Sequence, residues 1–304
     1  MGASPKKYCK INGIMKLNPE YKAWKDAQAT AQGPTATAVA VPATTVLNSA
    51  EALPIVSSIE DSMQLSEDIG QDVALSESTN AAIEMLQDPE IAAEVGLQPD
   101  DMIDELGSLL ARYEIPIGLT NKLMMISEYQ SLEFIVDDSG SMRLNTDTVD
   151  PKTRKPISRW IEAQRRLKEM IEVIAYVPFE QIGIEFLNRK DRISLKREGR
   201  TPEQFLVSAN QQIDSVFSRK PSGTTPALEK IQESFLRGQG INIARYFFGD
   251  GKPNGGQRAV DEIVKLLRNR PDPEQNPMTF LSCTDEDADV EWMKDAEEVS
   301  SKLQ

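Results

Sequence analysis

The sequence predicts an α/β fold in which a doubly wound, mostly parallel sheet lies between helices, with a small helical appendage at its N-terminal side. Three observations indicate this fold. From residue 131 onward, short apolar strands alternate with amphipathic helices, which is typical of parallel βαβ units. Several strands are nearly continuous apolar runs, as in sheets covered on both faces. Residues 79–130 show helical spacing without strands.

The first predicted strand, residues 131–136, ends in a loop with oxygen-bearing side chains at alternate positions. The stretch reads SLEFIVDDSGSM, so Asp137, Ser139 and Ser141 form a D-x-S-x-S pattern. Gly140 lets the backbone approach a small ion closely. Carboxylate and hydroxyl oxygens are hard donors that suit Mg²⁺ or Mn²⁺. Taken alone, the pattern is also typical of an ordinary strand-to-helix loop with Asx and Ser turns.

The segments that follow alternate as this fold requires. Helices are predicted at 160–174, 205–216, 226–235, 260–267 and 290–303, and strands at 181–187, 192–196, 241–248 and 278–283. The strand at 192–196 is expected to pair antiparallel at an edge, and the strand at 278–283 to lie in the centre of the sheet. Residues 143–158 are polar, contain Pro151 and Pro156, and form a long excursion at the edge where the D-x-S-x-S loop lies.

Two later loops add oxygen donors. Thr224 lies in the run Ser-Gly-Thr-Thr-Pro that opens a helix, and Asp250 follows an apolar strand that ends in Phe-Phe-Gly. In an open α/β sheet, ligands collect at the carboxyl ends of the strands, where all three segments are expected to meet. This set of residues resembles the metal-ion-dependent adhesion site of the von Willebrand factor A (vWA) domain family, which consists of D-x-S-x-S, a later Thr and a later Asp.

The resemblance covers residue 131 to the C-terminus and assigns a metal site. Its members are Asp137, Ser139, Ser141, Thr224 and Asp250, with Thr225 as the alternative threonine. It implies a Rossmann-like vWA domain in which the two serines and the threonine bind Mg²⁺ or Mn²⁺ directly while the acids act through water. A partner protein then presents a Glu or Asp to the metal. The usual vWA domain has one more strand and helix, which this sequence is expected to lack.

Other charged residues are predicted to lie around this site. Asp138 adds charge at the variable position of the motif and is expected to point away from the metal. Arg143, Asn145 and Lys252 are candidates for a rim that contacts a ligand carboxylate, and the alternative is that they are solvated loop side chains. The acidic run at 285–289 would repel an acidic partner or bind a second cation, although its spacing matches no calcium loop.

Composition limits the possible functions. The 304 residues include no histidine, which excludes a Ser-His-Asp or Cys-His nucleophile and any His-ligated metal. The two cysteines, Cys9 and Cys283, are too few for a disulfide framework, and Cys283 is expected to be buried. The net charge is −14, and residues 51–110 carry 15 acids without Lys or Arg. Because the rest of the fold has no basic excess, nucleic-acid binding is not expected.

Composition also divides the chain into three parts. Residues 1–50 form a Lys-rich, low-complexity tail and linker expected to be disordered, and residues 51–130 an acidic helical appendage. Residues 131–304 form the part that resembles a vWA domain. An apolar stripe at helical spacing predicts that the appendage packs on the sheet domain or on a partner. The stripe consists of Met102, Ile103, Leu106, Leu109 and Leu110. Its helix is expected to begin after a cap at Asp100 or Asp101.

The expected setting is cytoplasmic, because the sequence has neither an apolar run of membrane-spanning length nor a signal peptide. Export by another route is the alternative. The sequence leaves the oligomeric state open.

Two functions are compatible with these residues. The expected one is a non-enzymatic, divalent-metal-dependent protein-binding module, for example an adaptor or scaffold in a multiprotein or AAA+ assembly. The alternative is a metal-dependent phosphoryl-transfer or hydrolytic enzyme on a similar sheet. That enzyme would need a nucleophilic Asp followed two residues later by another Asp, and Ser139 occupies the second position. The sequence also has no G-x-x-x-x-G-K-[ST] phosphate loop.

Overall fold

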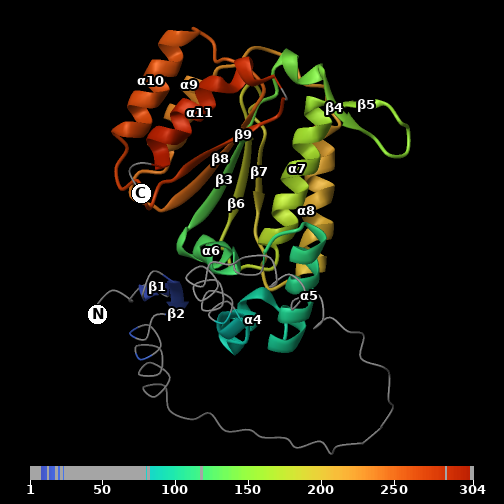
Figure 1. Ribbon diagram of the computed structural model, residues 1–304, viewed down its shortest axis with the longest axis vertical. Coiled ribbons are helices and arrows are strands. Elements are labelled where there is room, and N and C mark those ends of the chain that lie inside the picture. The colour runs from blue at the N-terminus through green and yellow to red at the C-terminus, as the bar shows by residue number, and fades with distance from the viewer. Residues whose placement is uncertain are drawn as a thin grey trace, which may run out of the picture.

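The computed structural model describes residues 8–11, 14–17, 20, 23, 80, 83–116, 119–284 and 286–301. Within them lies a mixed α/β fold with a five-stranded, mostly parallel sheet (Figure 1). The strands are β3 Ser131–Val136, β6 Ile182–Phe186, β7 Arg192–Leu195, β8 Ile243–Gly249 and β9 Met278–Ser282. Their order is β7-β6-β3-β8-β9. In this described sheet β7 runs antiparallel to its neighbour, as predicted, and the other pairs are parallel.

Helices cover both faces of this sheet (Figure 1). On one face lie α7 Arg159–Ile174 and α8 Pro202–Phe217, and on the other lie α9 Ala227–Arg237, α10 Gln257–Arg268 and α11 Asp287–Ser301. Successive strand residues alternate between two cores: Phe134 and Val136 pack on the α7 side, and Ile135 packs on the other. Burial on both faces explains the apolar strands. Each helix in the described ranges is too short or too polar to cross a bilayer.

Local capping sets where the helices on the first face begin. The Ser158 hydroxyl accepts a hydrogen bond from the Ile161 amide at 3.3 Å and caps α7. Thr201 and Gln204 form a capping box at the start of α8, where Pro202 occupies the first turn. The cap at Ser158 therefore makes Arg159 the first residue of α7.

The appendage consists of short helices below the sheet in Figure 1. These are α4 Pro89–Val95, α5 Pro99–Arg112, α6 Thr120–Met124 and the 3-10 turn η3 Met125–Glu128. Four residues of the apolar stripe of α5 are buried in the same core as α7 and the sheet, and the fifth, Ile103, is partly buried and packs against it. The buried Arg197 guanidinium donates hydrogen bonds to the carbonyls of Val95 and Val177 at 3.0 and 2.9 Å. The appendage thus packs on the sheet, which is one of the two alternatives expected from its sequence.

Two predicted elements differ from the observed ones in position. The strand at 278–283 was expected in the centre of the sheet, but β9 lies at an edge of the described sheet. Its buried residues alternate with partly exposed ones, as an edge position allows. Helix α5 starts at Pro99 with Gln98 as its N-cap residue, so a cap at Asp100 or Asp101 was wrong. Proline fits the first helical position because it has no amide hydrogen to leave unpaired.

Two β-hairpins were not predicted. The polar excursion contains β4 Asn145–Val149 paired with β5 Pro156–Ser158. The N-terminal tail contains β1 Tyr8–Ile11 paired with β2 Ile14–Leu17, where disorder was expected. The remaining residues of that tail lie outside the described part of the chain, apart from 20 and 23. The strands of the first hairpin contain few apolar residues, and those of the second have only four residues each, so both have little local pattern by which to recognise them.

Candidate metal centre

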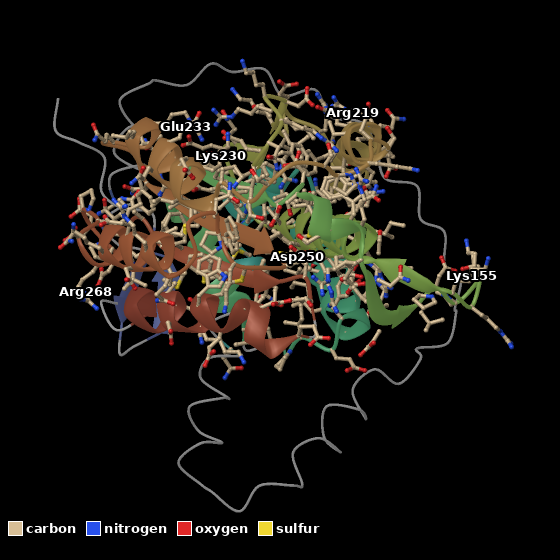
Figure 2. All side chains as sticks on the ribbon, turned by 90° about the horizontal axis from the view of Figure 1, so that it is seen from above. Lys155, Arg219, Lys230, Glu233, Asp250 and Arg268 are labelled. Carbon is tan, nitrogen blue, oxygen red and sulfur yellow. The ribbon has the colours of Figure 1, made fainter. Side chains whose placement is uncertain are left out.

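Four of the five predicted metal-site residues lie together at the carboxyl end of the sheet. The loop after β3 carries Asp137, Ser139 and Ser141, and Asp250 follows β8 directly. The Asp137 amide donates to the Phe248 carbonyl at 2.8 Å, so the pairing of the two strands continues into the site. Figure 2, which looks onto this end of the molecule, shows Asp250 near its centre. Parallel pairing of β3 and β8 thus brings Ser141 and Asp250 together, although they are 109 positions apart in the sequence.

A series of hydrogen bonds links these four residues. Asp137 Oδ1 accepts a hydrogen bond from the Ser139 amide at 2.7 Å. The Oγ atoms of Ser139 and Ser141 are 2.9 Å apart, and Ser141 Oγ donates to Asp250 Oδ1 at 2.8 Å. Asp137, Ser139 and Asp250 are buried. The two acids therefore hold the loop and its hydroxyls in place, as acids in the layer behind metal ligands do.

The predicted threonine lies in the neighbouring loop. The Gly140 amide donates to the Gly223 carbonyl at 3.1 Å, which places the two loops side by side. Thr224 is exposed, and its Oγ1 accepts a hydrogen bond from Asn254 Nδ2 at 2.9 Å. Thr225, the alternative threonine, donates its amide to Asn254 Oδ1 at 3.1 Å. Asn254 thus fixes both threonines at the border of the site.

Asp138 turns away from the hydroxyls, as expected, and connects the loop after β3 to the loop that contains Asn188 and Arg189. Its Oδ1 accepts hydrogen bonds from the amide and side chain of Asn188 at 2.8 and 3.0 Å, and its Oδ2 lies 3.2 Å from Arg189 Nε. The Asn188 side chain also donates to the Thr224 carbonyl at 2.8 Å. Gly223 has φ +115°, and a Cβ there would lie 2.5 Å from Asn188 Oδ1, so glycine is required.

Arg159 is a site residue that the sequence reasoning missed. Its Nη1 lies 3.1 Å from Asp250 Oδ2, and its side chain is 8% exposed. The ion pair occupies Oδ2 of Asp250 and leaves Oδ1 for Ser141. The sequence offered one signal, a cation directly after a serine cap, but a helical pattern does not show toward which residue such a side chain turns.

The electrostatics of Asp137 suit a cation. Burial, together with the nearby carboxylates of Asp250 and Asp138, raises the pKa of Asp137 to about 7, although hydrogen bonds from Ser139 oppose this. Asp137 Oδ2 is buried without a hydrogen-bond partner. An unpaired buried oxygen costs free energy that a bound cation would relieve. The donors present, carboxylate and hydroxyl oxygens, therefore fit Mg²⁺ or Mn²⁺.

Acid clusters do not provide another metal site in the described part of the chain. No group of three or more His, Cys, Asp or Glu side chains there is arranged to hold a metal ion. A cation at the centre would therefore depend on serine and threonine hydroxyls. The acidic run at 285–289, considered for a second cation, includes Asp285, which lies outside the described residues.

The three predicted rim residues are exposed at this end of the sheet. Arg143 is engaged with the neighbouring loop, because its Nε donates to the Pro221 carbonyl at 2.7 Å. Asn145 is the first residue of β4, and Lys252 lies just beyond Asp250. The geometry thus gives Arg143 a structural contact and leaves Asn145 and Lys252 as exposed side chains.

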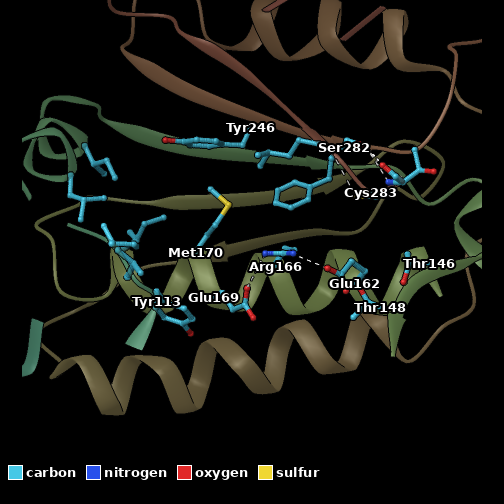
Figure 3. Close-up of a pocket in the computed structure, with 18 residues that line it drawn as sticks. Tyr113, Thr146, Thr148, Glu162, Arg166, Glu169, Met170, Tyr246, Ser282 and Cys283 are labelled. Carbon is cyan, nitrogen blue, oxygen red and sulfur yellow. Dashed lines mark hydrogen bonds and ion pairs between the residues drawn. The ribbon is translucent and has the colours of Figure 1, made fainter. Parts of the chain in front are cut away.

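A separate cavity of about 600 Å³ lies between α7 and the sheet (Figure 3). Met170 of α7 and Tyr246 of β8 contribute to its lining, and an ion pair from Arg166 Nε to Glu162 Oε1 of 2.9 Å lies along its side. Cys283 also lines it and is buried as predicted, and burial raises the pKa of its thiol. None of the predicted metal-site residues lines this cavity, so it is distinct from the metal centre.

Comparisons with known proteins do not assign the chain to a family. No protein-family model matches it, and no curated protein matches its sequence. Among solved structures it is similar to the PilB minor pilin from Streptococcus sanguinis, with a TM-score of 0.42 and 9% identity over 57% of this chain and 54% of the pilin.

Two other solved structures show similarities of the same kind. The conserved hypothetical protein BatB from Bacteroides thetaiotaomicron has a TM-score of 0.30 and 18% identity over 50% of this chain and 65% of BatB. The RO (RSR) protein from Deinococcus radiodurans has a TM-score of 0.29 and 16% identity over 71% of this chain and 42% of that protein. These partial similarities assign no activity to the chain.

Proposed function

We propose that the protein is a non-enzymatic protein-binding module of the vWA type, with a doubly wound, Rossmann-like sheet. In this proposal it binds a Glu or Asp side chain of a partner protein through Mg²⁺ or Mn²⁺ at the carboxyl end of the sheet. The observation that carries the proposal is the hydrogen-bonded series from Asp137 through Ser139 and Ser141 to Asp250, in which the buried Oδ2 atom of Asp137 has no hydrogen-bond partner.

The proposed roles follow from the side chains. Ser139, Ser141 and Thr224 would hold the cation directly, and Asp137 and Asp250 would act through water and orient the hydroxyls. Hydroxyl ligands are neutral, so they compensate little of the charge of a divalent ion. A carboxylate from a partner is then the favoured final ligand.

The charges around the centre support an acidic partner. Three buried carboxylates, those of Asp137, Asp138 and Asp250, face two guanidinium groups, those of Arg159 and Arg189. With all five ionised, the centre has one net negative charge. A bound divalent cation changes this to one net positive charge, which one carboxylate from a partner neutralises.

The first test removes the hydroxyls. We expect millimolar Mg²⁺ to raise the thermal midpoint of the wild type, because a ligand bound only by the native state stabilises it. The Ser139→Ala and Ser141→Ala double variant should fold but lose this shift. Ser222→Ala, an exposed serine in the adjacent loop, is the matched control and should retain it. A wild-type midpoint that neither Mg²⁺ nor Mn²⁺ moves contradicts the site.

The second test separates a binding module from an enzyme. Affinity capture with the full chain should recover partners in Mg²⁺ that are lost with EDTA and return when Mg²⁺ is restored. The same protein should show no phosphatase or nucleotidase turnover with Mg²⁺. Turnover that Asp137→Ala abolishes would replace this proposal with the hydrolytic alternative.

A further inference from the structure

The β4–β5 hairpin is built into the candidate metal centre at both ends. It leaves the D-x-S-x-S loop after Ser141 and returns through Ser158 to Arg159, which pairs with Asp250. The Arg159 amide donates to the Leu144 carbonyl at 2.8 Å and closes the base of the hairpin. A molecule that binds the base of the hairpin is therefore next to the candidate metal centre.

The hairpin projects from the body of the protein (Figure 1). Its two strands pair with no third strand among the described residues. Thr146 and Ile157 are buried, whereas Leu144 and Val149 are 55% and 51% exposed. A two-stranded ribbon has little stability of its own, and these exposed apolar side chains add nothing to the core. The outer surface of the hairpin is thus available for contacts with another molecule.

The tip of the hairpin is ordered and positively charged. Asp150 Oδ1 accepts hydrogen bonds from the amides of Lys152 and Thr153 at 2.7 and 2.8 Å, and the Asp150 amide donates to the Lys155 carbonyl at 2.9 Å. The side chains of Lys152, Arg154 and Lys155 are exposed, and none makes an ion pair within the described part of the chain. Figure 2 shows Lys155 at the far end of this projection.

We propose that this hairpin is a second contact surface for the partner protein, and that it binds an acidic, extended segment of that partner next to the carboxylate presented to the candidate metal centre. This inference rests on the proposed function. The three exposed cations of the tip outnumber its one carboxylate, Asp150, and attract acidic side chains. Leu144 and Val149 offer apolar contacts, and the unpaired edges of the ribbon can add an extended strand. A short protein segment fits better than nucleic acid, because three cations release few counterions from a phosphate backbone.

The test measures the binding of a short fluorescein-labelled peptide in which Glu alternates with Thr, by anisotropy on the full chain in Mg²⁺ and in EDTA. The tip variant combines Lys152→Gln, Arg154→Gln and Lys155→Gln. The matched control combines Arg258→Gln, Lys265→Gln and Arg268→Gln, three exposed cations of α10. Figure 2 shows Arg268 and Lys155 on opposite sides of the molecule. A peptide with Gln in place of Glu reports binding that does not depend on charge.

The tip variant should weaken binding of the Glu peptide about tenfold and reduce its salt dependence. Each of the three exposed charge pairs contributes little to the binding free energy, and their sum gives this factor. The α10 control should bind as the wild type does. Equal weakening in both variants, or none in the tip variant, overturns the hairpin proposal. So does tighter, tip-dependent binding of a DNA duplex or of phosphatidylserine vesicles.

The Mg²⁺ and EDTA arms separate this inference from the proposed function. If EDTA weakens the peptide but the tip variant does not, the metal-dependent module stands and the hairpin surface is wrong. If the tip variant weakens the peptide but EDTA has no effect, the hairpin contacts acids and the metal-dependent function fails. The expected result is that both EDTA and the tip variant weaken binding of the Glu peptide. Far-UV circular dichroism of the variants checks that they remain folded.

Discussion

The two carboxylate oxygens of Asp137 have different surroundings. Oδ1 accepts a hydrogen bond from the Ser139 amide, whereas Oδ2 is buried with no hydrogen-bond partner. Burial accordingly raises the pKa of this carboxyl to about 7, from a usual value of 3.8. In the absence of metal, the protonated form of Asp137 is thus favoured below about pH 7, and a cation at the proposed site would compete with this proton.

The raised pKa of Asp137 predicts how stability depends on pH. In EDTA, the folded state binds the Asp137 proton more tightly than the unfolded state does. The resulting stabilisation is fully present below pH 3.8 and is lost as the pH rises through about 7. Asp137→Asn should lack this contribution, and the difference between the two urea-unfolding free energies across this range measures it. Identical pH profiles would show that another group is responsible.

Arg159 supplies a positive charge to the centre when no metal is bound, because its Nη1 lies 3.1 Å from Asp250 Oδ2. Arg159→Met should therefore destabilise the metal-free protein by about 3–5 kcal/mol, since Asp250 is left buried without its partner. Mg²⁺ should restore part of the loss, so its shift of the thermal midpoint should be larger than in the wild type. Thermal unfolding with increasing Mg²⁺ measures this, and a smaller shift argues that Arg159 mainly orients Asp250.

At the scale of elements, a buried charge network holds α9 against the sheet. Glu133 of β3 and Glu185 of β6 both pair with Arg237 of α9, at 2.6 and 2.7 Å. Arg245 of β8 is buried, lies 3.4 Å from Glu133 and donates to the Ser234 hydroxyl of α9 at 2.6 Å. The loop that carries Thr224 leads into α9, so this network helps to position one border of the candidate metal centre.

Arg245→Met should destabilise the protein by about 3–5 kcal/mol, because Glu133 remains buried after its partner is removed. The matched control is Arg165→Met, which breaks an ion pair to Glu169 in which the arginine is 54% exposed. That change should cost less than about 1 kcal/mol. Urea unfolding measures both. Similar small losses would show that Ser234 and Arg237 satisfy Glu133 without Arg245.

At the scale of the whole molecule, the appendage and the sheet share a core. Leu106 of α5 is fully buried in the cluster that also contains Trp160 of α7 and the sheet residues Phe134 and Val136. Trp292 lies in the second core, on the opposite face of the sheet. The appendage and the sheet are therefore expected to unfold together.

Leu106→Ala tests this coupling. It should destabilise the whole fold by about 2–5 kcal/mol, through lost burial and the cavity left behind. Tryptophan fluorescence, which reports on both cores, and far-UV circular dichroism, which reports on the helices, should give one coincident urea transition in the wild type and in the variant. Helix loss at lower urea than the fluorescence change would show instead that the appendage unfolds independently.

Sequence alone was sufficient to predict the parallel strands and to place Asp137 and Asp250 at their carboxyl ends. Both predictions depend on local information, because an apolar run between turn residues marks a strand, and parallel strands end at the same edge. Sequence alone was not sufficient to predict that β9 lies at the edge of the described sheet, or that the β4–β5 hairpin forms. Strand order depends on pairing between distant segments, and short polar strands have weak patterns.

The sequence by itself determined the residue types at the candidate metal centre, which are acids and hydroxyls without histidine. Only the tertiary structure decided that Arg159 pairs with Asp250, that Asp138 turns toward Asn188 and that Asp137 keeps one oxygen unpartnered. The reason is physical: spacing along the chain sets which element a residue belongs to. The direction and partners of its side chain are set by packing against residues that are far away in sequence.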